Sequence, residues 1–264
     1  MARLFFVDVD GTILDGSRKM FEVSEKTRYA FNELKKNDYV IIASGRCMGL
    51  MDKKIISLNP SGYILCNGAY ASVGNKEVYA LYFEKQDLDK IVEVSMKYEG
   101  FYILETYDEM YIDSLDSKPF RTFMSGWASA LDGFKEGDIE AHRYMIAMIG
   151  FLDPKVKPYV EEELKGYVDL AAHKMFSSYD VNIRSVNKGT GVEKLREYLH
   201  VKYEDTYAFG DALNDVEMLQ AVNHPVVVAN CAKELKAYDF EKTDDVLDDG
   251  FYNYLVSNKL IKPL

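Results

Sequence analysis

The sequence is poor in basic residues. Its 32 Lys and Arg are outnumbered by 43 Asp and Glu, which gives a formal net charge of −11. Nucleic acids and anionic membrane surfaces select proteins with a basic face, so neither is expected as a main partner. A small phosphate ester stays compatible with an acidic chain, because a bound divalent cation reverses the local field of an acidic pocket.

Cysteine is scarce, and long apolar runs are missing. The three cysteines lie far apart and none forms a CxxC pair, which favours neither a disulfide framework nor a zinc site. The apolar run Leu4 to Val7 is too short for the core of a signal peptide, and no 18-residue apolar stretch follows it. We therefore expect a cytoplasmic protein.

Short apolar runs that end in small or polar residues predict buried strands. Amphipathic segments, such as 24–36 and 191–199, lie between these runs and predict helices. Apolar runs of this length suit parallel strands that are covered on both faces. The pattern predicts a doubly wound α/β fold whose ligands bind beyond the carboxyl ends of the strands. The runs are Leu4–Val7, Tyr39–Ala43, Tyr63–Cys66, Thr206–Phe209 and Pro225–Ala229.

The middle of the chain has a different pattern, which predicts α+β structure. We expect helices over 87–98 and 118–131 and from residue 153 onward, and strands over 101–105, 109–113, 144–151, 167–172 and 175–183. No Pro/Gly/Ser-rich linker marks the joints. We assign residues 1–82 and 185–264 to a core domain and residues 83–184 to an inserted domain.

Two carboxylates follow the first predicted strand, in the motif Asp8 to Thr12 (DVDGT). Side-chain alternation would aim Asp8 and Asp10 in the same direction. Buried together, they would repel each other, so that one keeps a proton or a cation lies between them. The motif by itself fits an Asp-Gly surface turn equally well.

Three further motifs lie at strand ends or helix starts. Gly210 to Asp215 (GDALND) offers the oxygen donors that Mg²⁺ prefers, although by itself it fits a helix cap better. Ser44-Gly45-Arg46 follows the second strand, and Lys188-Gly189 precedes a helix. A hydroxyl with a backbone amide, and an ammonium near a helix N-terminus, suit a phosphate oxyanion. Each is weak evidence alone, because Ser-Gly is commonly a turn and most lysines are solvated.

In this order, the four motifs resemble those of the haloacid dehalogenase-like (HAD) phosphatases. The motif Asn67-Gly68-Ala69, the long insertion and Asp249-Gly250 resemble the Cof-type branch, which has an α/β cap of subtype IIB. One residue and one short segment depart from that branch: Ala212 replaces a Ser or Gly, and Val228 to Cys231 (VANC) replaces Met-Gly-Asn-Ala. The resemblance implies a Rossmann-like catalytic core and a cap, residues 83–184, that closes over bound substrate.

The resemblance also implies a role for each matched position. Asp8 is implied as the nucleophile that forms an aspartyl phosphate, and Asp10 as the general acid and base. Mg²⁺ is the implied cofactor, held by Asp8, the backbone carbonyl of Asp10 and Asp211. Asp215 is implied either as a further Mg²⁺ ligand or as a residue that contacts the ligands without binding the ion. The implied phosphate-binding positions are Thr12, Ser44, Gly45, Lys188 and Asn214, and the candidate substrate contacts are Arg46 and Asn67.

The expected function is Mg²⁺-dependent hydrolysis of small phosphorylated metabolites, such as sugar phosphates. A phosphosugar mutase or phosphotransferase of the same superfamily stays open, because it would share Asp8 and Asp10. A receiver-type phospho-Asp signalling module is less well supported, because such modules lack a motif like the one that this chain has at 210–215. The physiological substrate and the oligomeric state do not follow from the sequence. Four residues of the predicted cap are candidate substrate contacts that also fit packing or surface roles: Tyr111, Arg143, His173 and Arg184.

Overall fold

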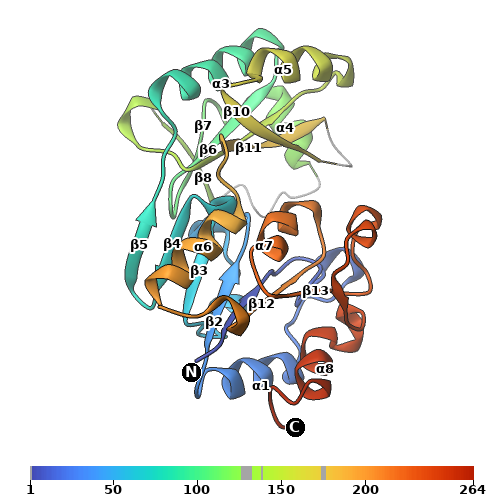
Figure 1. Cartoon of the computed structure of the whole chain (residues 1–264). Coiled ribbons are helices and arrows are strands. Elements are labelled where there is room, and N and C mark those ends of the chain that lie inside the picture. The colour runs from blue at the N-terminus through green and yellow to red at the C-terminus, as the bar shows by residue number, and fades with distance from the viewer. Residues whose placement is uncertain (1, 126–132, 138, 174–176) are drawn as a thin grey trace. The chain divides into compact units, whose positions relative to one another are not determined.

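The computed structural model describes residues 2–125, 133–137, 139–173 and 177–264, and these residues form two compact units (Figure 1). The core unit comprises the chain up to Gly45, Met51–Tyr79 and Asn187–Leu264. The inserted unit comprises Arg46–Leu50 and Ala80–Val186. The segment 46–50, which directly follows Ser44-Gly45, is thus part of the inserted unit, and the sequence pattern did not predict this.

The core unit contains an eight-stranded sheet with the order β14-β13-β12-β1-β2-β3-β4-β5. Its strands pair in parallel from β14 to β3, and β3 pairs antiparallel with β4. Strand β1 therefore lies between β12 and β2. The bounds are β1 Leu4–Val7, β2 Tyr39–Ala43, β3 Gly62–Leu65, β4 Tyr70–Val73, β5 Lys76–Ala80, β12 Thr206–Gly210, β13 His224–Val227 and β14 Glu241–Lys242.

Helices cover both faces of this sheet, which confirms the predicted doubly wound α/β fold. On one face, Phe6 of β1 packs in a cluster with Val192 and Leu195 of α6. On the other face, Phe251 of α8 contacts the ring of Phe209 in β12 at a centroid distance of 4.8 Å. The helices are α1 Glu25–Leu34, α2 Lys53–Ile56, α6 Lys188–Tyr198, α7 Val216–Gln220 and α8 Gly250–Ser257.

The inserted unit contains a six-stranded sheet with the order β10-β11-β9-β6-β7-β8. All its pairs are antiparallel except β7–β8. The strands are β6 Phe101–Glu105, β7 Met110–Ile112, β8 Phe134–Glu136, β9 Ile146–Gly150, β10 Val168–Ala172 and β11 Ser178–Ile183.

Helices α3 (Lys85–Lys97) and α5 (Lys157–Leu164) pack on one face of the second sheet. Helix α4 (Lys118–Met124) packs on its other face, where the rings of Phe120 and Phe101 lie 5.7 Å apart. The α+β prediction is thus confirmed, although the helix predicted over 118–131 ends at Met124 and residues 126–132 lie outside the described part. Among the helices described, none has the length and apolar character needed to cross a bilayer.

Candidate active site

Three of the predicted site residues follow adjacent parallel strands. Asp8 comes directly after β1, Ser44 after β2 and Asp211 after β12, and Lys188 is the first residue of α6. Because the carboxyl ends of neighbouring parallel strands meet at one edge of the sheet, the fold brings these motifs together. The amide of Asp8 still donates to Phe209 O at 3.0 Å, which ties the loop after β1 to β12.

Lys188 is the central cation of the site. Its Nζ lies 2.6 Å from Asp8 Oδ1 and 2.6 Å from Asp215 Oδ1, and its side chain is only 1% exposed. Burial by itself would lower the pKa of the Lys188 ammonium, but the charges of Asp215 and Asp8 outweigh burial and raise it. The ammonium therefore stays charged and orients both carboxylates.

Asp215 supports the loop that carries Asp211. Its Oδ1 accepts from Lys188, while its Oδ2 accepts from the backbone N–H groups of Asp211 and Ala212, both at 3.0 Å. A carboxylate with both oxygens engaged in this way is held rigidly. Asp215 thus orients Asp211 through the backbone.

The site has more negative than positive charge. Burial, and then the charge of Asp215, raise the pKa of Asp211 to about 7, and the same two causes raise the pKa of Asp8 well above its usual range. One ammonium cannot balance three carboxylates, so without another cation at least one of them keeps a proton near neutral pH.

The oxygen donors of this cluster fit a divalent cation. Asp8, Asp211 and Asp215 each offer one ligand atom, and these atoms lie within 4.8 Å of one another. Carboxylate oxygens are the ligands that Mg²⁺ prefers, and a cation here would offset the excess charge. Since Asp215 already binds Lys188 and two amides, Asp8 and Asp211 are the better placed donors.

The turn after β1 requires glycine at position 11. Gly11 has φ +92°, and a Cβ there would overlap the carboxylate of Asp211. Thr12 is buried, and its Oγ1 lies 3.4 Å from Asp211 Oδ1. Asp8 is buried whereas Asp10 is exposed, so the two aspartates of the motif have different environments.

Four other predicted residues meet near the end of β2. Ser44 is buried, and its amide donates to Ile64 O at 2.8 Å. A Cβ at Gly45 would lie 2.9 Å from Asn67 Oδ1, and the same oxygen accepts from Asn214 Nδ2 at 3.3 Å. Asn67, predicted as a substrate contact, follows β3, and its amide donates to Ser44 O at 3.3 Å, so that it links the loop after β2 to the loop after β12.

The remaining candidates belong to the inserted unit. Arg46 donates from Nη1 to Leu50 O at 3.3 Å. Tyr111 hydrogen-bonds to Glu109, and the guanidinium of Arg143 lies over the ring of Tyr82 at 3.8 Å. His173 contacts Ser178 and Asp180, and Arg184 contacts Gly166 O, so both also have partners inside this unit. Their proposed substrate contacts stay predictions.

Sequence reasoning missed two supporting residues. Asn187 caps α6, because its side chain accepts from Thr190 N and orders the turn that holds Lys188. Tyr79 donates from its hydroxyl to Gly68 O at 2.6 Å and fixes the loop after β3. The capping signal Asn-x-x-Thr before a helix is visible in the sequence, but the Tyr79 contact has no local signal.

Known proteins resemble the chain over almost its whole length. It is 27% identical to the putative phosphatase YkrA of Bacillus subtilis over 256 residues, which are 94% of this chain and 95% of that protein. It is 24% identical to the 5-amino-6-(5-phospho-D-ribitylamino)uracil phosphatase YcsE of the same organism, over 94% of this chain and 92% of that protein.

Solved structures share the fold. A hypothetical protein from Geobacillus kaustophilus superposes with a TM-score of 0.87 at 25% identity, over 99% of this chain and 100% of that one. The HAD subclass IIB sugar phosphatase BT4131 superposes with a TM-score of 0.82 at 19% identity, over 98% and 100% of the two chains. The haloacid dehalogenase-like hydrolase family matches residues 5–255. The chain therefore belongs to the haloacid dehalogenase-like hydrolases.

Proposed function

We propose that this hydrolase is a Mg²⁺-dependent phosphatase of small phosphorylated metabolites, which works through an aspartyl phosphate on Asp8. The observation that carries the proposal is the buried cluster at the strand ends, in which Lys188 Nζ lies 2.6 Å from Asp8 Oδ1 and from Asp215 Oδ1 beside Asp211. A carboxylate that is buried, oriented and paired with a cation suits nucleophilic attack on phosphorus.

The first step transfers the phosphoryl group to Asp8. A carboxylate oxygen of Asp8 forms a bond to phosphorus while the bond from phosphorus to the ester oxygen breaks. Lys188 holds Asp8 Oδ1, which leaves the other oxygen to attack. Asp10 gives its proton to the leaving oxygen, and the product alcohol departs.

The second step releases phosphate. Asp10, now ionised, takes a proton from water as the water oxygen attacks phosphorus, and the bond to Asp8 breaks. The exposure of Asp10 suits this role, because both its proton and the attacking water come from solvent. Ser44, Thr12 and Lys188 would bind the phosphate oxygens.

Asp8, Asp211 and the backbone carbonyl of Asp10 would hold Mg²⁺. When bound, the ion supplies positive charge that allows a phosphate dianion to approach the carboxylates. Asp215 supports this arrangement through the Asp211 amide.

The names of similar proteins support a broad substrate class, but no individual substrate. One relative is named a phosphatase of 5-amino-6-(5-phospho-D-ribitylamino)uracil, and a structure with the same fold is a sugar phosphatase. We infer small phosphorylated metabolites, such as sugar phosphates, as the class for this chain. No observation favours the mutase alternative.

A phosphate-release screen over phosphorylated metabolites, with Mg²⁺ and with EDTA, tests the proposal. We expect release from at least one sugar phosphate or related monoester, and its loss in EDTA. If no compound of the panel releases phosphate in the presence of Mg²⁺, the phosphatase assignment is overturned. Activity that needs a bisphosphate activator and releases little phosphate would indicate a mutase instead.

The metal site has its own test. Mg²⁺ should raise the melting temperature of the protein at pH 8 more than at pH 6, because Asp211, with its pKa raised to about 7, must lose its proton to bind the ion. Asp211→Asn should remove most of this shift in scanning fluorimetry. An equal shift in the parent and in this variant would contradict the assignment of Asp211 as a ligand.

A further inference from the structure

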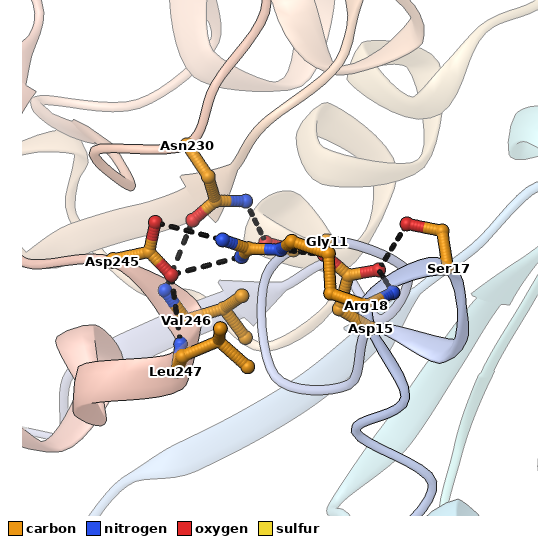
Figure 2. A network of polar contacts seen from close by, with 8 residues as sticks. All are labelled: Gly11, Asp15, Ser17, Arg18, Asn230, Asp245, Val246 and Leu247. Atoms are coloured by element: carbon orange, nitrogen blue, oxygen red, sulfur yellow. Dashed lines mark hydrogen bonds and ion pairs between the residues drawn. The ribbon is translucent and has the colours of Figure 1, made fainter.

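Asn230 bridges two segments that are distant in sequence. Its Nδ2 donates to Gly11 O at 2.7 Å, and its Oδ1 accepts from Val246 N at 2.9 Å (Figure 2). One partner is a carbonyl and the other an N–H, so the orientation of the side-chain amide is fixed by its partners. The amide donates from one atom and accepts at another, whereas a Ser or Thr hydroxyl does both from a single oxygen.

The Gly11 peptide lies between the proposed catalytic groups. Its N–H donates to Leu14 O at 2.7 Å, its carbonyl accepts from Asn230, and its Cα lies against Asp211, where no side chain would fit. Asp10 precedes this residue and Thr12 follows it. Movement of the Gly11 peptide would therefore move the proposed acid and base on one side and a phosphate-binding residue on the other.

A second contact joins the same two segments. Arg18 donates to both oxygens of Asp245, at 3.0 and 2.8 Å, and from Nε to Asp15 at 2.7 Å (Figure 2). The Arg18 and Asp245 side chains are 34% and 26% exposed, and ion pairs that are this accessible contribute little to stability. The Asn230 amide, which binds two backbone groups, is the stronger determinant of where Gly11 lies.

We propose that Asn230 is a positioning residue for the reaction at Asp8: its amide fixes the Gly11 peptide and thereby places Asp10 and Thr12. This inference rests on the proposed function. It gives a role to Asn230, which is the residue of the segment Val228 to Cys231 that matches the branch pattern Met-Gly-Asn-Ala and which contributes no group to the proposed chemistry. The role depends on the donor half of the amide, since the acceptor half binds Val246 and not the catalytic loop.

The substitution Asn230→Asp removes the donor of the side chain and keeps its acceptor. An ionised carboxylate can still accept from Val246 N but cannot donate to Gly11 O. The matched control is Asn258→Asp, because Asn258 Nδ2 also donates to a backbone carbonyl, Tyr254 O at 2.9 Å, at the end of α8. A second variant, Asn230→Ala, removes both hydrogen bonds without adding charge.

We expect Asn230→Asp to lower kcat about 10- to 100-fold, with KM changed by less than about 3-fold, because misplaced reacting groups slow the chemical step. Asn258→Asp should keep the parent kcat. Hydrogen exchange should become faster in the peptide that covers Gly11 to Leu14 for both Asn230 variants, and stay at the parent rate there for the control. The inference is overturned if Asn230→Asp keeps the parent kcat, or if exchange in this peptide is unchanged.

The two readouts separate this inference from the proposed function. If the parent protein releases no phosphate from any substrate in the screen, the proposed function fails. Hydrogen exchange then still decides whether Asn230 holds the Gly11 loop: faster exchange supports that part, and unchanged exchange overturns it. Where Asn230→Asp does not fold, Asn230→Ala is measured in its place.

Discussion

The two units of the molecule each bury carboxyl groups, but they do so in different ways. In the core unit, Asp8 and Asp215 share the ammonium of Lys188, and Asp215 also accepts from two backbone amides. In the inserted unit, Glu105 on β6 has no cation beside it, and its Oε2 has no hydrogen-bond partner among the described residues. In the first arrangement the ammonium of Lys188 offsets part of the negative charge, although burial and the charge of Asp215 still raise the pKa of Asp8. In the second, no cation among the described residues opposes the effect of burial on the pKa of Glu105.

The surroundings of Glu105 indicate a structural role. Burial raises the pKa of Glu105 to about 7, and its hydrogen bonds come from the side chain and backbone of Cys47. The next residue of that segment, Met48, donates its amide to Tyr107 O at 2.7 Å. Glu105 thus helps to attach residues 46–50 to the turn after β6. The comparison teaches that burial of an acid does not by itself mark a catalytic site, because the charges around it decide its state.

The sharpest contrast between the two units is in catalysis. Asp10→Asn should lower kcat about 10²- to 10⁴-fold, because it removes the proposed general acid and base. Glu105→Gln should leave kcat within about 3-fold of the parent value, because its carboxyl lies outside the proposed chemistry. Steady-state phosphate release measures kcat for both variants. An equal loss of kcat in the two would contradict the claim that only the core unit's carboxyl takes part in the chemistry.

The second contrast is in stability at neutral pH. Lys188→Met should lower the free energy of unfolding by about 3–5 kcal/mol at pH 8, because it leaves Asp8 and Asp215 buried without their cation. The loss should shrink at pH 5, because Asp8, whose pKa burial raises well above its usual range, takes up a proton there. Urea unfolding measures this, with Lys36→Met at an exposed ion pair as the control. A loss of less than about 1 kcal/mol at pH 8 would contradict the central role of the ammonium.

The smallest effect concerns the pH dependence of Glu105. Its pKa is about 7 in the folded chain against 4.5 ordinarily, so between these values the folded state binds a proton that the unfolded state has lost. Its contribution to the free energy of unfolding therefore falls, by about 3 kcal/mol in total, as pH rises through this window. Glu105→Gln should gain stability relative to the parent by about this amount between pH 4.5 and pH 8. Urea unfolding of this variant and of the exposed control Glu162→Gln gives the difference, and a parallel pH profile for parent and Glu105→Gln would contradict the raised pKa.

The strands of the core sheet were predictable because their residues are buried on both faces. Runs such as Leu4–Val7 carry a continuous apolar signal, and Asp8 stands directly at the end of that run. The two-residue strand β14 and the three-residue strand β8 were not predicted. Their sequences, Glu-Lys and Phe-Lys-Glu, carry no strand pattern, and they exist because a neighbouring strand offers its edge.

The sequence named the residues of the candidate site, but it did not predict the contacts among them. Asp8 and Lys188 lie 180 positions apart, and only the family resemblance joined them before the structure placed Nζ at 2.6 Å from Oδ1. The double role of Asp215, which binds both Lys188 and the Asp211 loop, has no signature in the motif itself. The bridge from Asn230 to Gly11 spans 219 positions, and a distance of this kind follows only from the fold.

The central claim is that Asp8 carries the phosphoryl group as an acyl phosphate. The protein is incubated with Mg²⁺ and a substrate found in the screen, quenched in acid and treated with borohydride, which reduces an acyl phosphate to an alcohol and releases phosphate. Peptide mass spectrometry should then find homoserine at position 8 in the parent and the unmodified amide in Asp8→Asn, which should show no turnover. Reduction at another carboxylate, or turnover by Asp8→Asn at a rate comparable to the parent, would contradict the account.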